Sequence, residues 1–216
     1  MGLDGSAGSA LALRWAAART NRFGPIQPVA SWQYPWWSLT PLAPGVATLP
    51  PPSVDFHAEA RQVIDQMLAQ VSPVCHLEPL TVHGPAGQSL VAAAEGASLL
   101  VVGSRGHSAV ASGVLGSVSL YCVNHATAPV VVVSPDSTPQ DRFQRVVVGL
   151  DGSDSSVNAL TWAVANTPAE AEIEVIYSWR LGDTVTVERS ASSSPAKLPQ
   201  ITMPLATWNG MMTSSM

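Results

Sequence analysis

The stretch VVGSRGHSAVASGVLGSVS, residues 101–119, runs from an apolar segment through a glycine-rich loop into the start of a predicted helix. The loop holds Gly103, Gly106, Gly113 and Gly116, and Ser117 follows at the expected helix N-terminus. Glycine lets the main chain turn with positive φ and lets an anion approach its N–H groups. A helix start adds further N–H donors and a partial positive charge. The loop alone is therefore compatible with a phosphate site or with a tight turn.

The segments around this loop predict alternating strands and helices. Uninterrupted runs of valine and leucine predict strands buried on both faces, and amphipathic or alanine-rich stretches between them predict helices. We expect strands at 26–33, 77–84, 97–104 and 128–135, helices at 7–19, 54–71, 86–95 and 114–126, and a proline-rich loop at 34–53. With right-handed crossovers, this order predicts an α/β fold with an open, doubly wound parallel sheet.

An internal repeat divides the chain. Residues 2–17, GLDGSAGSALALRWAA, align without gaps on residues 149–164, GLDGSDSSVNALTWAV. In the second copy a β-branched strand, 145–150, precedes the motif, and a helix near 155–166 and a strand at 172–179 follow it. In the first copy the opening strand is missing or reduced to a stub. One hypothesis is that residues 145–149 fill its place, within the chain or from another one.

The repeat predicts two domains of unequal completeness. We assign residues 1–136 to a nearly complete domain, 137–144 to a linker and 145–180 to the start of a second, truncated domain. Residues 181–216 are rich in serine, threonine and proline and are predicted to form an irregular tail.

Composition excludes several classes of protein. The formal charge is −5 and the pI about 5.4, with no basic run, which argues against nucleic-acid binding. No apolar stretch approaches the roughly 18 residues of a membrane span, and the first residues lack a signal-peptide pattern, so we expect a cytoplasmic protein. The two cysteines, Cys75 and Cys122, are expected to be reduced, and the histidines show no metal-ligand spacing.

The predicted sheet brings two motifs to one edge. In doubly wound sheets ligands bind at the carboxyl ends of the strands, where the winding direction reverses. Asp4 and the glycine loop both follow strand ends, so we expect them to share one crevice. Arg105 and His107 offer cationic contacts, and Ser117 either donates its hydroxyl to a phosphate or caps the helix. The loop has neither a Walker A lysine nor dinucleotide-fold spacing.

The sequence GSRGHSAVASGVLGS resembles the nucleotide-binding signature of the universal stress protein family, Gly-x2-Gly-x9-Gly-Ser/Thr. The GLDGS opening, the TVHG strand end, LLVVGSRG and APVVVV are also similar to that family in order and separation. The resemblance covers residues 2–135, with a second start at 145–179. It implies the universal stress protein fold, which is similar to that of the adenine nucleotide alpha hydrolases.

The same resemblance implies an ATP site. Asp4 would contact the sugar and base, the glycine loop and Ser117 would hold the phosphates, and a residue around 29–31 would pack on the adenine. The second copy carries the matching Asp151 but ends before a glycine signature. The predicted site residues are Gly2, Asp4, Ala30, Gly103, Ser104, Arg105, Gly106, His107, Gly116, Ser117 and Val118.

These residues predict a non-catalytic, ATP-binding regulator of a stress or dormancy response. No catalytic base is identifiable, although Mg²⁺ bound through the phosphates and slow hydrolysis are compatible with the sequence. The alternatives are a protein that dimerises through the 129–133 edge strand without binding a nucleotide, an adenylating enzyme, and a truncated gene product that folds poorly.

Overall fold

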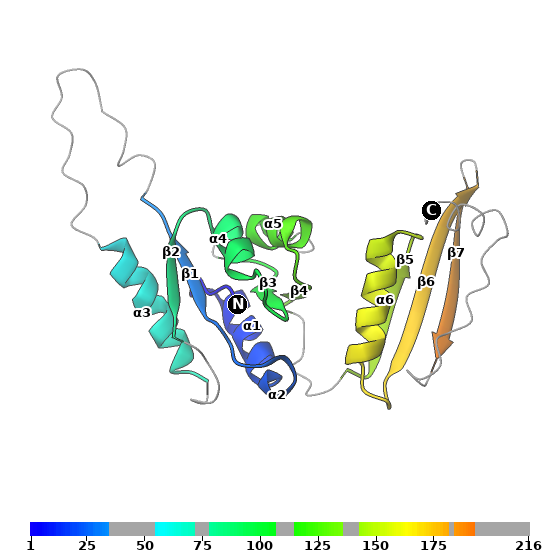
Figure 1. The fold of residues 1–216 in the computed structure, drawn as a ribbon, viewed down its shortest axis with the longest axis horizontal. Coiled ribbons are helices and arrows are strands. Elements are labelled where there is room, and N and C mark those ends of the chain that lie inside the picture. Colours follow the sequence, from blue (N-terminus) through cyan, green and yellow to red (C-terminus); the bar gives the residue numbers. More distant parts are fainter. Residues whose placement is uncertain (35–54, 72–77, 107–114, 136–142, 182–183, 193–216) are drawn as a thin grey trace, which may run out of the picture. The chain divides into compact units, whose positions relative to one another are not determined.

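The computed structural model describes residues 1–34, 55–71, 78–106, 115–135, 143–181 and 184–192, with side chains up to Tyr177. Contacts divide the chain into two compact units, Met1–Pro139 and Gln140–Met216 (Figure 1). The division falls within the predicted linker 137–144. The helices and strands of the first unit are α1 (Ala7–Ala17), α2 (Thr20–Phe23), β1 (Val29–Trp32), α3 (Phe56–Leu68), β2 (Leu80–His83), α4 (Ala86–Ala93), β3 (Leu100–Gly103), α5 (Ser117–His125) and β4 (Val130–Val133).

The strands of the first unit are parallel. Strand β1 pairs with β2 from Val29 opposite Leu80, and β3 pairs with β4 from Leu100 opposite Val130. Each pair therefore runs in the orientation that a crossover helix requires.

Residues 1–3 lie between these two pairs. The Gly2 N–H donates to the Val101 carbonyl at 3.1 Å, and the Leu3 N–H donates to the Val29 carbonyl at 2.9 Å. The Val29 N–H in turn donates to the Met1 carbonyl at 2.8 Å. The spatial order is β2, β1, residues 1–3, β3, β4, so the winding reverses at residues 1–3, between β1 and β3.

Helices cover both faces of this sheet, as the sequence predicts. On the face of α1 and α3, a buried cluster includes Leu13, Ile64 and Val101. On the face of α4 and α5, a second cluster includes Leu100 and Cys122. Successive residues of β3 alternate between the two clusters because strand side chains alternate faces. Burial of each such leucine or isoleucine contributes about 1.5–3 kcal/mol.

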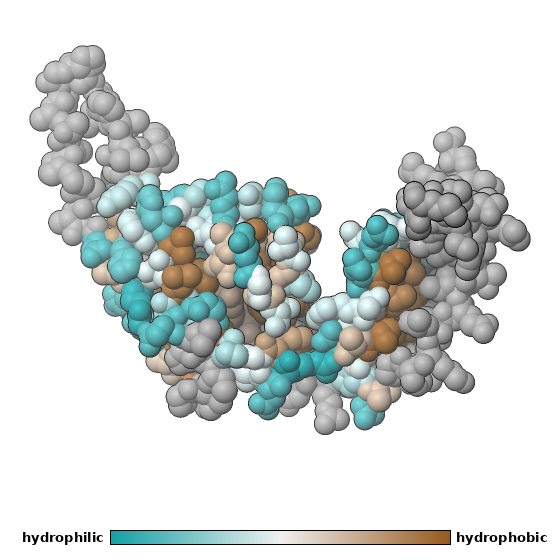
Figure 2. All heavy atoms as spheres, in the orientation of Figure 1, coloured by the Kyte–Doolittle hydropathy of each residue, from teal (hydrophilic) through white to brown (hydrophobic). Residues whose placement is uncertain are grey.

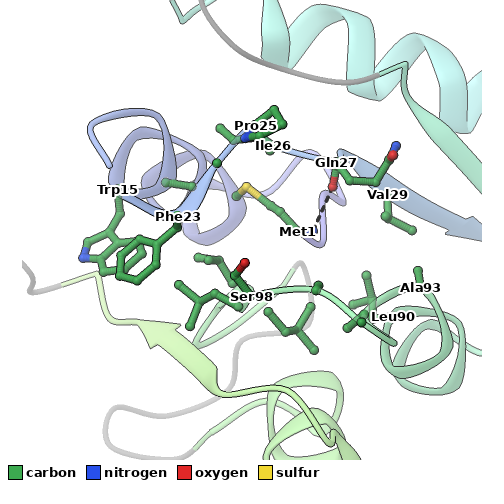
Figure 3. Close-up of a pocket in the computed structure, with 18 residues that line it drawn as sticks. Met1, Trp15, Phe23, Pro25, Ile26, Gln27, Val29, Leu90, Ala93 and Ser98 are labelled. Atoms are coloured by element: carbon green, nitrogen blue, oxygen red, sulfur yellow. Dashed lines mark hydrogen bonds between the residues drawn. The ribbon is translucent and has the colours of Figure 1, made fainter. Parts of the chain in front are cut away.

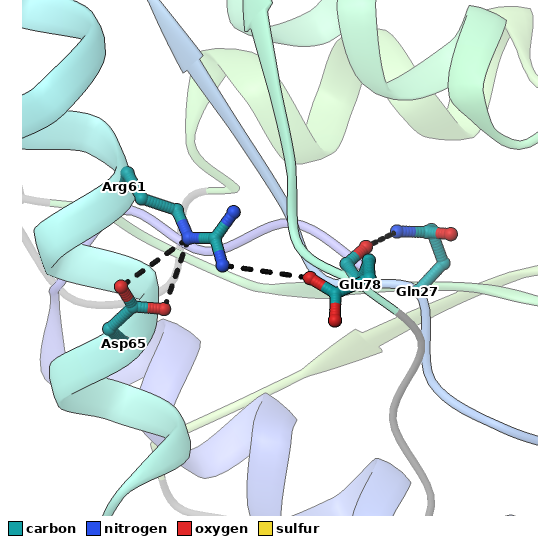
Figure 4. Close-up of polar contacts among 4 residues, drawn as sticks. All are labelled: Gln27, Arg61, Asp65 and Glu78. Atoms are coloured by element: carbon teal, nitrogen blue, oxygen red, sulfur yellow. Dashed lines mark hydrogen bonds and ion pairs between the residues drawn. The ribbon is translucent and has the colours of Figure 1, made fainter.

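Polar contacts hold α3 beside the segments that lead into β1 and β2 (Figure 4). The Arg61 guanidinium contacts Asp65 at 3.2 Å on the same helix and Glu78 at 3.7 Å. The Gln27 side-chain amide donates to the Glu78 carbonyl at 2.5 Å. Hydrophilic residues cover the outer side of α3 in Figure 2. These exposed ion pairs each contribute no more than about 1 kcal/mol.

The second unit contains a mixed sheet with one described helix. Its elements are β5 (Arg145–Leu150), α6 (Asp154–Asn166), β6 (Glu172–Leu181) and β7 (Thr184–Ser192). Strand β5 is parallel to β6, and β7 is antiparallel to β6. The core of this sheet and α6 includes Val148, Ala163, Ile173 and Tyr177.

One expectation is corrected here. The predicted irregular tail begins with a strand, since 184–192 form β7; the short alternation TVTV and the hydrogen bonds to β6 outweigh the low strand propensity of its serines. Residues 193–216 lie outside the described residues. In the second unit residues 145–149 belong to β5 and pair with β6, and the hypothesis that such a strand completes the first sheet stays a prediction.

No helix in the described part of the chain is long and apolar enough to cross a membrane.

Candidate functional site

A crevice of about 300 Å³ opens where β1, residues 2–4 and β3 end. It lies at the point where the winding reverses, which is where doubly wound sheets bind ligands. Its lining residues are Gly2, Leu3, Asp4, Ser6, Ser9, Val29, Ser31, Ala86, Leu90, Val102, Gly103, Arg105, Gly106, Gly116, Ser117, Val118 and Ser119.

The crevice brings together eight of the eleven predicted site residues: Gly2, Asp4, Gly103, Arg105, Gly106, Gly116, Ser117 and Val118. Ala30 and Ser104 are not among the residues that line it, and His107 lies outside the described residues. Ala30 is buried in the cluster beneath α1 and α3. Its neighbours Val29 and Ser31 line the crevice instead, because side chains alternate along β1.

Asp4 is positioned by a turn that its own side chain stabilises. Its Oδ1 accepts the Ser6 N–H at 2.9 Å, and Gly5 between them has a φ of 85°. Ser6 then caps α1, since its hydroxyl accepts the Ser9 N–H at 3.1 Å. One carboxylate oxygen is thus held by the turn.

The other carboxylate oxygen of Asp4 faces the glycine loop. A Cβ placed on Gly106 would lie 2.5 Å from Asp4 Oδ2, closer than any such contact can be. The absence of a side chain at residue 106 therefore lets the loop and the carboxylate meet at the mouth of the crevice.

The second repeat builds the same turn. Asp151 Oδ1 accepts the Ser153 N–H at 2.9 Å and the Ser153 hydroxyl at 2.7 Å, and Gly152 has a φ of 87°. Hydrogen bonds from the Ser153 hydroxyl and N–H, and then from Ser156, lower the pKa of the exposed Asp151 carboxyl from 3.8 to about 2.

The described glycines of the loop serve close approach rather than a left-handed backbone. The glycines with positive φ in the described residues are Gly5, Gly24, Gly84, Gly96 and Gly152, none of which belongs to this loop. A Cβ on Gly103 would lie 2.6 Å from the Gly8 carbonyl carbon, so α1 packs directly on the end of β3. Gly103 thus has a packing role. Gly106 and Gly116 line the crevice, and a Cβ on either of them would not come so close to a backbone atom.

The N-terminus of α5 supplies backbone donors to the crevice. Gly116 stands at the N-cap position without a side-chain cap, and its own N–H donates to the Ser104 carbonyl at 2.8 Å. The Ser119 hydroxyl donates to the same carbonyl at 3.1 Å, which fixes the helix start against β3. The first-turn N–H groups and Arg105 give this side of the crevice a positive potential suited to an anion.

Sequence reasoning missed several lining residues. Ser31 was signalled by the alternation of side chains along β1, and Ser119 by its position one helical turn into α5.

Ser104 lies beside the crevice with a buried hydroxyl that has no partner among the described residues, while its N–H donates to the Val133 carbonyl at 2.8 Å.

Parallel strands, helices on both faces and a crevice at the reversal point define a doubly wound α/β protein. Residues 1–134 match the model of the universal stress protein family, and the chain belongs to this family.

The chain is similar to universal stress proteins of mycobacteria. It is 31% identical over 193 residues to universal stress protein Rv2623 of Mycobacterium tuberculosis, covering 83% of this chain and 62% of that protein. The chain thus spans less than two thirds of the length of this relative. A second relative, from Mycolicibacterium smegmatis, is 32% identical over 179 residues, covering 76% of this chain and 57% of that protein.

Solved structures give more distant matches. UspA of Lactobacillus plantarum matches with a TM-score of 0.46 and 18% identity, over 61% of this chain and 93% of that one. A universal stress protein solved in complex with cAMP matches with a TM-score of 0.38 and 26% identity, over 62% of this chain and 92% of that one.

Proposed function

We propose that the first unit binds an adenine nucleotide in this crevice, with ATP as the expected ligand, and that it acts as a non-catalytic regulator in a stress or dormancy response. The observation that carries the proposal is the meeting of Asp4 with Gly106, beside the donors of α5. Three separate segments, at residues 2–4, 103–106 and 116–118, converge on one space. The phosphates would lie at the α5 N-terminus, and the sugar near Asp4.

The chemistry of the lining favours binding over catalysis. Asp4 is the single carboxylate among the described lining residues, and one of its oxygens is held by the Ser6 N–H. Mg²⁺ would enter with the phosphates rather than through a protein ligand set, since the described residues hold no cluster of three or more histidine, cysteine, aspartate or glutamate side chains.

Calorimetric titration with ATP tests the site. Gly106→Ala should displace the Asp4 carboxylate, and Ser117→Ala should remove a hydroxyl from the helix start; we expect each to weaken ATP binding tenfold or more. Gly149→Ala and Ser155→Ala are matched controls, because a Cβ at residue 149 meets nothing within 4 Å and Ser155 is exposed on α6. Equal affinity in all five proteins would refute the site.

We also propose that two copies associate through β4. Within the described sheet β4 pairs with β3 alone, which leaves its other edge for a second strand. Val132→Pro should lower the mass measured by light scattering from dimer to monomer, because residues 129 and 133 direct their backbone groups to β3, so the Val132 N–H lies on the open edge and proline removes it. A wild-type chain that is monomeric at high concentration would contradict this.

A further inference from the structure

The hydroxyl of Ser104 lacks a partner although it is buried. Ser104 follows the last residue of β3 and is 7% exposed, and its Oγ has no hydrogen-bond partner among the residues that the structure describes. A buried hydroxyl in this state has lost the hydrogen bonds that water would make with it, which costs free energy. We therefore expect its partner to come from outside the described chain.

Main-chain hydrogen bonds fix Ser104 in place. Its N–H donates to the Val133 carbonyl at 2.8 Å, which continues the ladder between β3 and β4. Its carbonyl accepts the Gly116 N–H at 2.8 Å and the Ser119 hydroxyl at 3.1 Å. Residue 104 is thus held to β4 and to the start of α5 at once, and a shift of its backbone toward water would break hydrogen bonds to both elements.

The acceptors at this junction already have donors. The Ser119 hydroxyl shares its single proton between the Ser104 carbonyl and the Gly116 carbonyl, at 3.1 and 2.9 Å. The Gly116 carbonyl also accepts the Leu120 N–H at 2.9 Å. A carbonyl oxygen has two lone pairs, so both carbonyls are fully used. The Ser104 hydroxyl therefore has no acceptor in either of them.

The Ser104 side chain lies on the face of the sheet that borders the nucleotide crevice. Val102 belongs to the cluster beneath α4 and α5, and side chains alternate along a strand, so Ser104 lies on this face too. Val102 lines the crevice, as do Gly103 and Arg105 on either side of Ser104 in the chain. The unsatisfied hydroxyl is thus next to the lining at the end where α5 begins.

We propose that the bound nucleotide completes this hydrogen bond: the Ser104 hydroxyl donates to a phosphate oxygen, which approaches it between Gly103 and Ser119. This inference rests on the proposed nucleotide site and assigns Ser104 as an additional contact that recognises phosphate. A charged oxygen is the stronger acceptor, and the N-terminus of α5 attracts the same group. The free protein bears the cost of the buried hydroxyl and the complex recovers it, so one group lowers stability without the ligand and raises affinity for it.

Urea denaturation of the 216-residue chain, with and without ATP, tests the proposal on Ser104→Ala. Hydrogen exchange of the buried Leu13 amide reports on unfolding of the first unit. Without ATP we expect the variant to unfold at an equal or higher urea concentration than the wild type, because an unsatisfied hydroxyl has been removed. The same concentration of ATP should raise the urea midpoint of the wild type more than that of the variant.

Affinities for ATP and adenosine separate a phosphate contact from a structural role. Calorimetric titration should show that Ser104→Ala binds ATP about tenfold more weakly, whereas its affinity for adenosine, measured by competition with ATP, should equal that of the wild type, because adenosine has no phosphate. Ser98→Ala is the matched control and should change neither affinity, since Ser98 is an exposed serine that leads into β3 and does not line the crevice.

Three results would overturn the proposal and leave the nucleotide site standing. The first is equal ATP affinity in the wild type and Ser104→Ala, and the second is an equal loss of affinity for ATP and adenosine, which indicates a structural role. The third is a ligand-free variant that unfolds at a lower urea concentration, because the hydroxyl would then have a partner in the free protein. A wild-type chain that does not bind ATP would instead refute the nucleotide site itself, and this inference with it.

Discussion

At the scale of single residues, the structure places eight of the eleven predicted site residues in the lining of the crevice and leaves Ala30 and Ser104 out of it. The sequence predicts that a residue around 29–31 contacts the ligand, but it does not show which face of the sheet each side chain occupies. The prediction of Ala30 falls on the wrong face of β1, and Val29 and Ser31 face the crevice. Ser104 belongs to the predicted glycine loop, and its hydroxyl is buried beside the crevice. A motif fixes positions along the chain, whereas the side that each residue faces depends on how the strand enters the sheet.

The Asp151 turn leads to a prediction about acid titration. The folded pKa of about 2 lies below the ordinary 3.8, so the stabilisation of the turn is complete above pH 3.8 and is lost as the pH falls through 2. Carboxyl-detected NMR should find an Asp151 midpoint near pH 2 in the wild type. Ser153→Ala should move it up toward 3.8, because the hydroxyl is the largest cause of the shift. A midpoint near 3.8 in the wild type would show that these hydrogen bonds do not hold in solution.

At the scale of elements, the prediction was accurate where burial dictates the pattern. The strands of the first sheet read as continuous valine and leucine runs because helices cover both faces, and each predicted strand contains an observed one. The short α2 and the whole of β7 were missed. Strand β7 depends on pairing with β6, which is a contact between segments that local periodicity does not record.

The packing of α1 on β3 predicts the effect of a side chain at residue 103. Gly103→Ala would place a Cβ 2.6 Å from the Gly8 carbonyl carbon, and backbone on both sides leaves little room for relaxation. We expect a loss of about 1–3 kcal/mol in the unfolding free energy of the first unit. Urea denaturation, monitored through hydrogen exchange of the buried Leu13 amide, measures this loss of unfolding free energy. Gly149→Ala is the control, and an unchanged stability would mean that α1 shifts freely on the sheet.

At the scale of the whole molecule, the internal repeat was the most informative feature of the sequence. It places Asp-Gly-Ser in both copies, and in both units the aspartate Oδ1 accepts the serine N–H at 2.9 Å. It predicted an opening strand that is missing or reduced to a stub, but not that residues 1–3 pair with both β1 and β3. That outcome depends on three backbone hydrogen bonds, at Gly2, Leu3 and Val29, which no pattern of side chains encodes. The crevice and a second cavity beside Met1, shown in Figure 3, both reach this part of the sheet, since Val29 and Leu90 line both cavities.

Among the side chains of the second unit that the structure describes, which end at Tyr177, few are buried, and this predicts a fragile sheet. Its described core, built from side chains of β5, α6 and β6, depends on Ile173, which is 1% exposed. Ile173→Ala should cost about 2–5 kcal/mol, which is a large share of the stability that so small a core provides. The amides of Val146 and Val148 should then lose their exchange protection at 25 °C. Val147→Ala, at a side chain that is 52% exposed in the same strand, should leave the protection intact. Protection that survives the loss of Ile173 would show that contacts beyond this described core stabilise the sheet.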